Sequence, residues 1–173
     1  MAFEEMCDIE NKVMEVRELR AILIGNDKEP CETRLKCDRD GGCLKALQMR
    51  VGDTIAPFDV LFEDFGGVTL YVNDNGLAEN EPNRAIFATE KMAETGYLSQ
   101  MDYKSVVKPG DLYTIINGPI VAVGFDPETG ENVSLTDEQA EKVADYFTRV
   151  SGPGSGVFAV MLIRLGVQMR RSA

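Results

Sequence analysis

The stretch DLYTIINGPIVAVGFDPETGENVSLTDEQAEKVADYF, residues 111–147, carries the clearest secondary-structure signals in the chain. Its first half is rich in apolar and β-branched residues, which is typical of strands. Asn117-Gly118 interrupts this run and is a strong hairpin turn signal. The sequence therefore predicts two strands that are joined by a tight turn.

The second half of the same stretch predicts a turn and a helix. Pro127 and Gly130 are typical of a turn, and Thr136 followed by Gln139 forms a capping box that begins a helix. One side of this helix is apolar and the opposite side is charged, so we expect it to pack on the sheet by one side only. The apolar stripe consists of Ala140, Val143, Ala144 and Phe147.

The segments before residue 111 add further strands and one helix. Residues 18–25 and 31–37 flank the turn-rich segment 26–30 and predict a strand pair. Residues 40–51 predict a short helix that Asp40 caps and Gly52 ends. Strands are also expected over 54–62, 67–73 and 85–88, whereas 89–105 is too irregular to assign.

This order of elements predicts an α+β fold. We expect a single domain with a largely antiparallel sheet and two or three helices packed on one face. A chain of 173 residues suits one such domain. The domain is expected over 15–150, after an acidic N-terminal leader at 1–14 and before a Gly/Pro linker with an apolar C-terminal segment at 151–173.

The C-terminal apolar run is too short to span a bilayer and too apolar to be solvated. Residues 157–168 are compatible with a buried strand or with a helix at an interface, because short apolar runs do not distinguish the two. A homo-oligomer that forms through 157–168 is therefore one expectation.

The formal net charge of −11 argues against direct nucleic-acid binding, which needs a basic surface. An acidic mimic of DNA is compatible with this charge, but ordinary solubility explains the same charge and is the favoured interpretation. The sequence contains no run long enough for a membrane helix and no signal-peptide pattern. We expect a cytoplasmic protein.

The cysteines and the missing histidines bear on metal binding and catalysis. The four cysteines, in the first quarter of the chain, lack the spacing of a zinc site, so we expect reduced, unrelated thiols, no metal and no cofactor. The chain has no histidine, which removes the commonest general base and the usual nucleophile pairs. A non-catalytic protein is the expectation, although clustered carboxylates could still support an enzyme.

The polar stretch 73–84 is the candidate ligand site. Its spacing excludes a calcium loop, because proline would stand where the bidentate glutamate is needed. One interpretation is structural, in which Asn-Gly turns the chain and arginine satisfies carbonyls. The other is a pocket for an anionic or nucleotide-like ligand. The candidate residues are Asn73, Asp74, Asn75, Asn83 and Arg84.

Three segments together resemble a known family. The three segments are PFDVLFED with VTLYVNDNGLAENEPNRAIF, YTIINGPIVAVGFD, and SLTDEQAEKVADYF. They are similar to the domain-of-unknown-function family 3846 of bacteria, phages and conjugative elements. The similarity covers about residues 15–150. It implies an α+β fold and an accessory gene of a mobile element, and it supplies no activity.

These observations give three functional hypotheses. The first is a small non-catalytic binding protein, accessory to a phage or mobile element, that acts against host defence by sequestering a small anionic ligand or by occupying a host protein. The second is an acidic DNA mimic or protein-interaction module. The third is an enzyme of unknown class.

Overall fold

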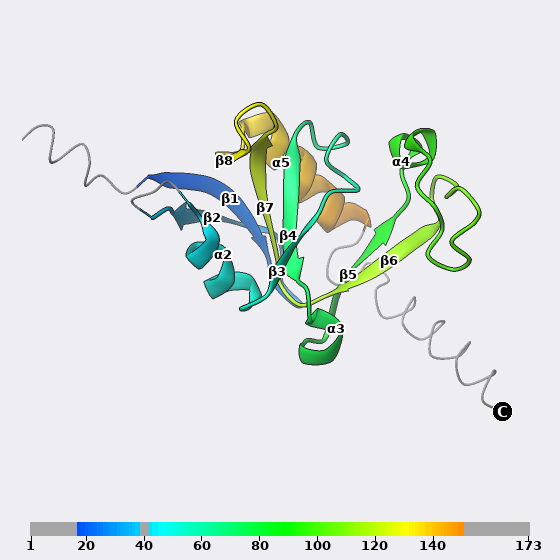
Figure 1. Ribbon diagram of the computed structural model, residues 1–173, viewed down its shortest axis with the longest axis horizontal. Helices are drawn as coiled ribbons and strands as arrows, with labels where there is room; N and C mark the ends of the chain where they lie inside the picture. The colour runs from blue at the N-terminus through cyan, green and yellow to red at the C-terminus, as the bar shows by residue number, and fades with distance from the viewer. Residues whose placement is uncertain (1–16, 39–41, 151–173) are drawn as a thin grey trace, which may run out of the picture.

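The first two strands pair as the sequence predicts. The computed structural model describes residues 17–38 and 42–150 (Figure 1). Strand β1 (Glu18–Ile24) pairs antiparallel with β2 (Cys31–Lys36). The leader predicted over 1–14, the predicted cap Asp40 and the apolar segment 157–168 lie outside the described residues.

Strand β7 (Ile120–Asp126) lies at the centre of the main sheet (Figure 1). The strand order is β2-β1-β7-β4-β3, and β8 (Glu131–Val133) also pairs with β7. β4 (Val68–Asn73) agrees with its predicted range, whereas β3 (Ile55–Phe58) is shorter than the predicted 54–62. The strand pairs of the described chain are all antiparallel, which confirms the predicted sheet type.

β5 (Pro82–Phe87) and β6 (Leu112–Asn117) form a second, two-stranded sheet. The predicted hairpin of β6 with β7 is therefore wrong, because these strands pair in different sheets. The turn itself is sharp: Gly118 has φ +89°, and a Cβ there would lie 2.7 Å from the Asn80 Oδ1. Since β6 already has β5 as its partner, this turn directs the chain into the main sheet.

Helices cover both faces of the main sheet. α2 (Leu44–Val51) shares one apolar cluster with Val121 and Val123 of β7. α5 (Asp137–Asp145) and the π-helical turn η1 (Tyr146–Val150) share the other cluster with Ile120 and Ala122. Successive strand residues point to opposite faces, so the expectation that the helices share one face is corrected. Residues 120–123 are all fully buried, and such a strand needs cover on both sides.

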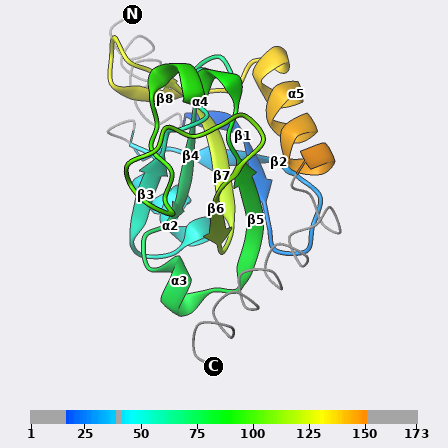
Figure 2. The ribbon, with the colours of Figure 1, turned by 90° about the vertical axis from the view of Figure 1, so that its right-hand side faces the viewer.

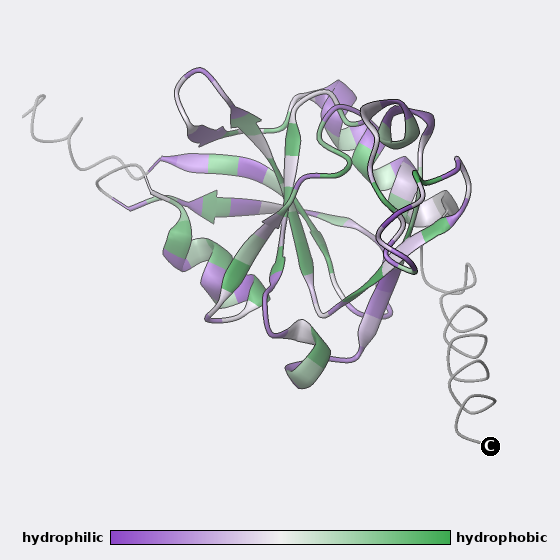
Figure 3. Ribbon diagram, turned by 45° about the vertical axis from the view of Figure 1, so that its right-hand side comes forward, coloured by the Kyte–Doolittle hydropathy of each residue, from purple (hydrophilic) through white to green (hydrophobic). Residues whose placement is uncertain are grey.

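The capping box of α5 is present as predicted. The Thr136 Oγ1 accepts a hydrogen bond from the Gln139 main-chain N–H at 3.1 Å, and the Gln139 side chain accepts one from the Thr136 N–H at 3.0 Å. Two short helices complete the fold: α3 (Gly76–Glu79) and α4 (Glu90–Thr95), which lies in the unassigned stretch 89–105. Figure 3 shows hydrophobic residues concentrated in the central strands. The single-domain α+β class is confirmed.

Cys37 and Cys43 are joined by a disulfide bond, which corrects the expectation of unrelated thiols. The chain folds back between β2 and α2, where the Asp38 N–H donates to the Gly42 carbonyl at 2.8 Å. This turn brings the two cysteine Cα atoms to 4.5 Å. Cys31 is free and exposed. Within 17–38 and 42–150, no helix is long and apolar enough to cross a membrane.

Candidate functional site

The five predicted ligand residues do not form one open pocket. They lie along the end of β4, the single turn of α3 and the start of β5. Asn73, Asn83 and Arg84 are buried, with exposed fractions of 7%, 4% and 1%. Asp74 and Asn75 are exposed. The buried residues belong to two separate hydrogen-bond networks.

The first network surrounds the Asn73 side-chain amide. Its Nδ2 donates to the Glu79 Oε2 at 3.0 Å and to the Asn80 Oδ1 at 2.9 Å. Its Oδ1 accepts hydrogen bonds from the Asn75 main-chain N–H at 2.9 Å and from the Thr54 hydroxyl at 3.3 Å. The amide is thus fully used within the protein. It ties the end of β4 to α3.

The second network links the two sheets through Asn83. The Asn83 Nδ2 donates to the Ile24 carbonyl at 2.9 Å and to the Gly118 carbonyl at 2.8 Å. The Arg84 Nη1 donates to the Asn83 Oδ1 at 2.7 Å, and its Nη2 donates to the Lys28 carbonyl. Asn83 therefore holds the end of β1 and the turn after β6 together.

Arg84 keeps one unused donor. Its Nε is buried and has no hydrogen-bond partner, and no ion pair to it is formed within the described residues. Burial lowers the pKa of the guanidinium, and the nearby charges of Glu29 and Asp27 oppose this shift. A buried charge without a close partner is uncommon in proteins.

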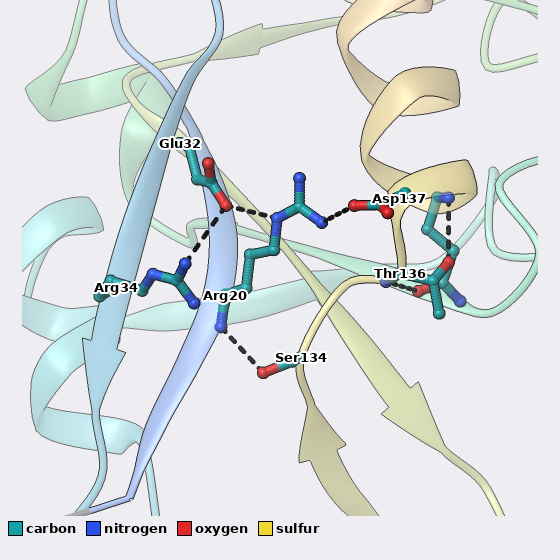
Figure 4. Close-up of polar contacts among 7 residues, drawn as sticks. Arg20, Glu32, Arg34, Ser134, Thr136 and Asp137 are labelled. Carbon is teal, nitrogen blue, oxygen red and sulfur yellow. Dashed lines mark hydrogen bonds and ion pairs between the residues drawn. The ribbon is translucent and has the colours of Figure 1, made fainter.

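A surface cluster of charges joins the first hairpin to α5 (Figure 4). The Arg20 guanidinium donates to Glu32 and, at 2.5 Å, to the Asp137 Oδ1. Its main-chain N–H donates to the Ser134 hydroxyl at 3.0 Å, and Arg34 lies 3.7 Å from the same Glu32 carboxylate. The hydrogen bonds to Asp137 and Glu32 raise the pKa of Arg20. Both carboxylates are already used by arginines, so this cluster is structural.

Two adjoining cavities lie where the connection between β3 and β4 meets α4 and the end of β7. Their volumes are about 300 and about 650 Å³. They share five lining residues, and we call them together the end groove. In Figure 2, α4 and β8 lie at the same end of the molecule, opposite α3. The shared residues are Phe62, Glu63, Lys91, Phe125 and Pro127.

Residues 97–107, between α4 and β6, form a loop that is closed by its own hydrogen bonds. The Val107 N–H donates to the Tyr97 carbonyl at 2.9 Å, and the Ser99 N–H donates to the Ser105 carbonyl at 2.8 Å. At its end, the Asp102 carboxylate accepts from the Ser105 hydroxyl at 2.6 Å and from two main-chain N–H groups. These hydrogen bonds lower the pKa of Asp102 to about 2, and the bond from the Ser105 hydroxyl has the largest effect.

The same loop exposes four large apolar side chains, which we call the apolar tip. Their exposed fractions are 43% for Leu98, 78% for Met101, 72% for Tyr103 and 49% for Val106. Apolar side chains that gather at one exposed place are typical of interaction surfaces.

Neither the end groove nor the apolar tip was predicted from the sequence. Both depend on the stretch 89–105, whose pattern was not assigned. A signal was present: Thr89 caps α4 by accepting from the Met92 N–H, and Gly96 ends it with φ 90°. Recognition of that helix would have isolated residues 97–107 as a separate loop. Within the described ranges, no group of three or more acidic or cysteine side chains is placed to hold a metal ion.

The fold and these surfaces define a single-domain α+β protein with two packed sheets and a groove beside an exposed loop. Residues 19–148 match the family described as a domain of unknown function, DUF3846. This match covers most of the chain, so the protein belongs to that family. Comparison with curated proteins and with solved structures found no match.

Proposed function

We propose that this protein is a non-catalytic binding protein that recognises a partner protein through the apolar tip of residues 97–107. The main support for this proposal is that one loop exposes four large apolar side chains, Leu98, Met101, Tyr103 and Val106. Full burial of an exposed apolar side chain of this size is worth about 1.5–3 kcal/mol, and only Met101 and Tyr103 are mostly exposed, at 78% and 72%. A partner that covers them would recover part of this free energy.

The loop is suited to recognition because its shape is fixed before binding. The Asp102 carboxylate holds the Lys104 and Ser105 N–H groups at 2.9 and 3.0 Å. The backbone of Tyr103 has φ 56°, which is a left-handed conformation that residues other than glycine rarely adopt. A preformed loop loses less conformational entropy on association. Tyrosine and methionine are also enriched at the centre of protein interfaces.

The family resemblance suggests the setting of this function. An accessory protein of a phage or mobile element would act by occupying a host protein, and an acidic protein would favour a partner with a basic surface. Binding should then weaken as salt concentration rises.

Affinity capture from a host lysate, quantified by mass spectrometry, tests the proposal. The double variant Met101→Ser/Tyr103→Ser should reduce capture of a specific partner by about tenfold or more, since central tyrosines dominate many interfaces. The matched control is Met49→Ser/Leu77→Ser, which removes side chains that are 85% and 88% exposed elsewhere. Equal capture by wild type and both variants would contradict the proposal.

One observation favours a second candidate, an anionic ligand at Arg84. The buried Nε without a partner is a donor that a phosphate or carboxylate oxygen could use if the surrounding backbone moved to admit it, because Arg84 is only 1% exposed. Calorimetry with nucleoside phosphates would compare wild type with Arg84→Lys, which keeps a charge but loses the planar donor set. Binding that is absent, or that is equal in both proteins, removes this candidate.

A further inference from the structure

We propose that the end groove binds the guanidinium group of an arginine side chain on the partner protein, an inference that rests on the proposed function. The groove has a suitable size. Its smaller cavity, of about 300 Å³, lies at the lower end of the range for ligand pockets and suits one long side chain.

The charge of the groove favours a cation. Four carboxylates line the two cavities, against one ammonium group, that of Lys91, which gives a formal charge of −3. The Lys91 Nζ donates to the Glu63 carbonyl at 3.2 Å and so leaves the Glu63 carboxylate free to accept. The acidic residues are Asp59, Glu63, Asp64 and Asp126.

Aromatic rings form the apolar part of the same groove. Phe62 and Phe125 meet edge to face, with ring centroids 6.4 Å apart. Tyr97 also lines the smaller cavity, and its pKa is raised by burial and by charges that include Asp59 and Glu63. Guanidinium groups stack on aromatic rings and bind carboxylates through two parallel hydrogen bonds. Rings beside carboxylates therefore favour arginine over lysine.

Thr69 also lines the smaller cavity and is 4% exposed, so the wall beside the aromatic rings includes a polar residue.

The groove and the apolar tip can engage one partner. Tyr97 lines the groove and is also the first residue of the 97–107 loop, where its carbonyl accepts from the Val107 N–H. A protein that covers the tip therefore lies beside the groove mouth. One arginine from that protein would fill the groove.

An NMR titration of the full ¹⁵N-labelled chain tests this inference. The probes are acetyl-Gly-Gly-Arg-Gly-Gly-amide and the same peptide with citrulline, which is a neutral isostere of arginine. The arginine peptide should shift the amide resonances of residues 59–69, Phe125 and Asp126. The citrulline peptide should bind about tenfold more weakly, because it lacks the charge.

Three variants sharpen the test. Glu63→Gln should weaken arginine binding several-fold, whereas Lys91→Ala should strengthen it, because it removes the competing cation. Glu81→Gln is the control, since it changes the net charge equally at an exposed residue before β5. Opposite effects of Glu63→Gln and Lys91→Ala cannot come from unfolding, which would weaken binding in both.

The inference is overturned if citrulline binds as tightly as arginine, if the shifted resonances lie elsewhere, or if neither peptide binds up to about 10 mM. The partner-capture experiment distinguishes a failure of this inference from a failure of the proposed function. If the apolar-tip variant loses the partner but Glu63→Gln retains it, the groove assignment fails and the function stands.

Discussion

The Arg84 guanidinium donates a hydrogen bond of 2.7 Å to the side-chain oxygen of its neighbour Asn83, in the interior of the protein. The Asn83 amide nitrogen in turn donates to carbonyls of Ile24 and Gly118, which belong to the end of β1 and to the turn before β7. The polar pair therefore holds the small sheet against the main sheet.

Asn83→Ala should be strongly destabilising. It leaves the carbonyls of Ile24 and Gly118 without their donor and the Arg84 Nη1 without its side-chain acceptor. Each buried group left unpaired costs about 1–3 kcal/mol, and three groups are affected, so we expect the free energy of unfolding to fall by about 3 kcal/mol or more. Urea denaturation measures this change. Asn75→Ala, at an exposed position, is the control and should cost under about 1 kcal/mol.

Gly76→Ala should also destabilise the fold, by a steric mechanism. An added Cβ would lie 2.4 Å from the main-chain oxygen of Asn117, which cannot move freely because it is part of the backbone. Overpacking of this kind costs about 1–3 kcal/mol. Thermal unfolding would measure the effect against Gly42→Ala, where a Cβ meets nothing within 4 Å. Similar melting temperatures for the two variants would show that α3 shifts to accept the methyl group.

Local signals in the sequence predicted part of this fold well. The capping box of Thr136 and Gln139 fixes the start of α5 through contacts three residues apart, and Gly52 ends α2 as expected. The β1–β2 pair follows from a short turn between two strand patterns. In each of these elements, residues close in the sequence determine the structure.

The remaining features depend on contacts between distant residues. Asn117-Gly118 predicts a turn, but the pairing of β6 with β5 instead of β7 is set by a segment about 30 residues earlier. The candidate site shows the same limit. Asn73, Asn83 and Arg84 are polar in the sequence, yet their partners include Thr54, Ile24 and Lys28, so their burial follows only from the assembled sheets.

Asp102→Ala should loosen the 97–107 loop without unfolding the domain. The carboxylate accepts three hydrogen bonds within the loop, and its pKa of about 2 shows that the charged form is favoured there. Because the folded pKa lies below the ordinary value of 3.8, this contribution is present above pH 3.8 and is lost as the pH falls toward 2. Hydrogen exchange of the Lys104 and Ser105 amides should therefore accelerate in the variant at pH 7. Unchanged exchange would mean that the main-chain bonds alone hold the loop.

Tyr146 should make stability depend on pH in the alkaline range. Its hydroxyl accepts a hydrogen bond from the Phe87 N–H at 3.0 Å, and burial raises its pKa from 10.0 to about 12. The neutral phenol is thus favoured in the folded state. Its contribution is complete below pH 10 and is lost as the pH rises from 10 to 12, by roughly 2–3 kcal/mol in total.

Tyr146→Phe removes the two hydrogen bonds of the hydroxyl, from the Phe87 N–H and to the Phe87 carbonyl, and it also removes this titration. At pH 8 the variant should be less stable than wild type by about 1–3 kcal/mol, because the Phe87 N–H loses its acceptor. Urea denaturation at several values between pH 8 and 12 should then show the difference shrinking, since only wild type has a phenol at this position that loses its proton once unfolding exposes it. Parallel curves for the two proteins would contradict the raised pKa and would place the alkaline loss of stability in other groups.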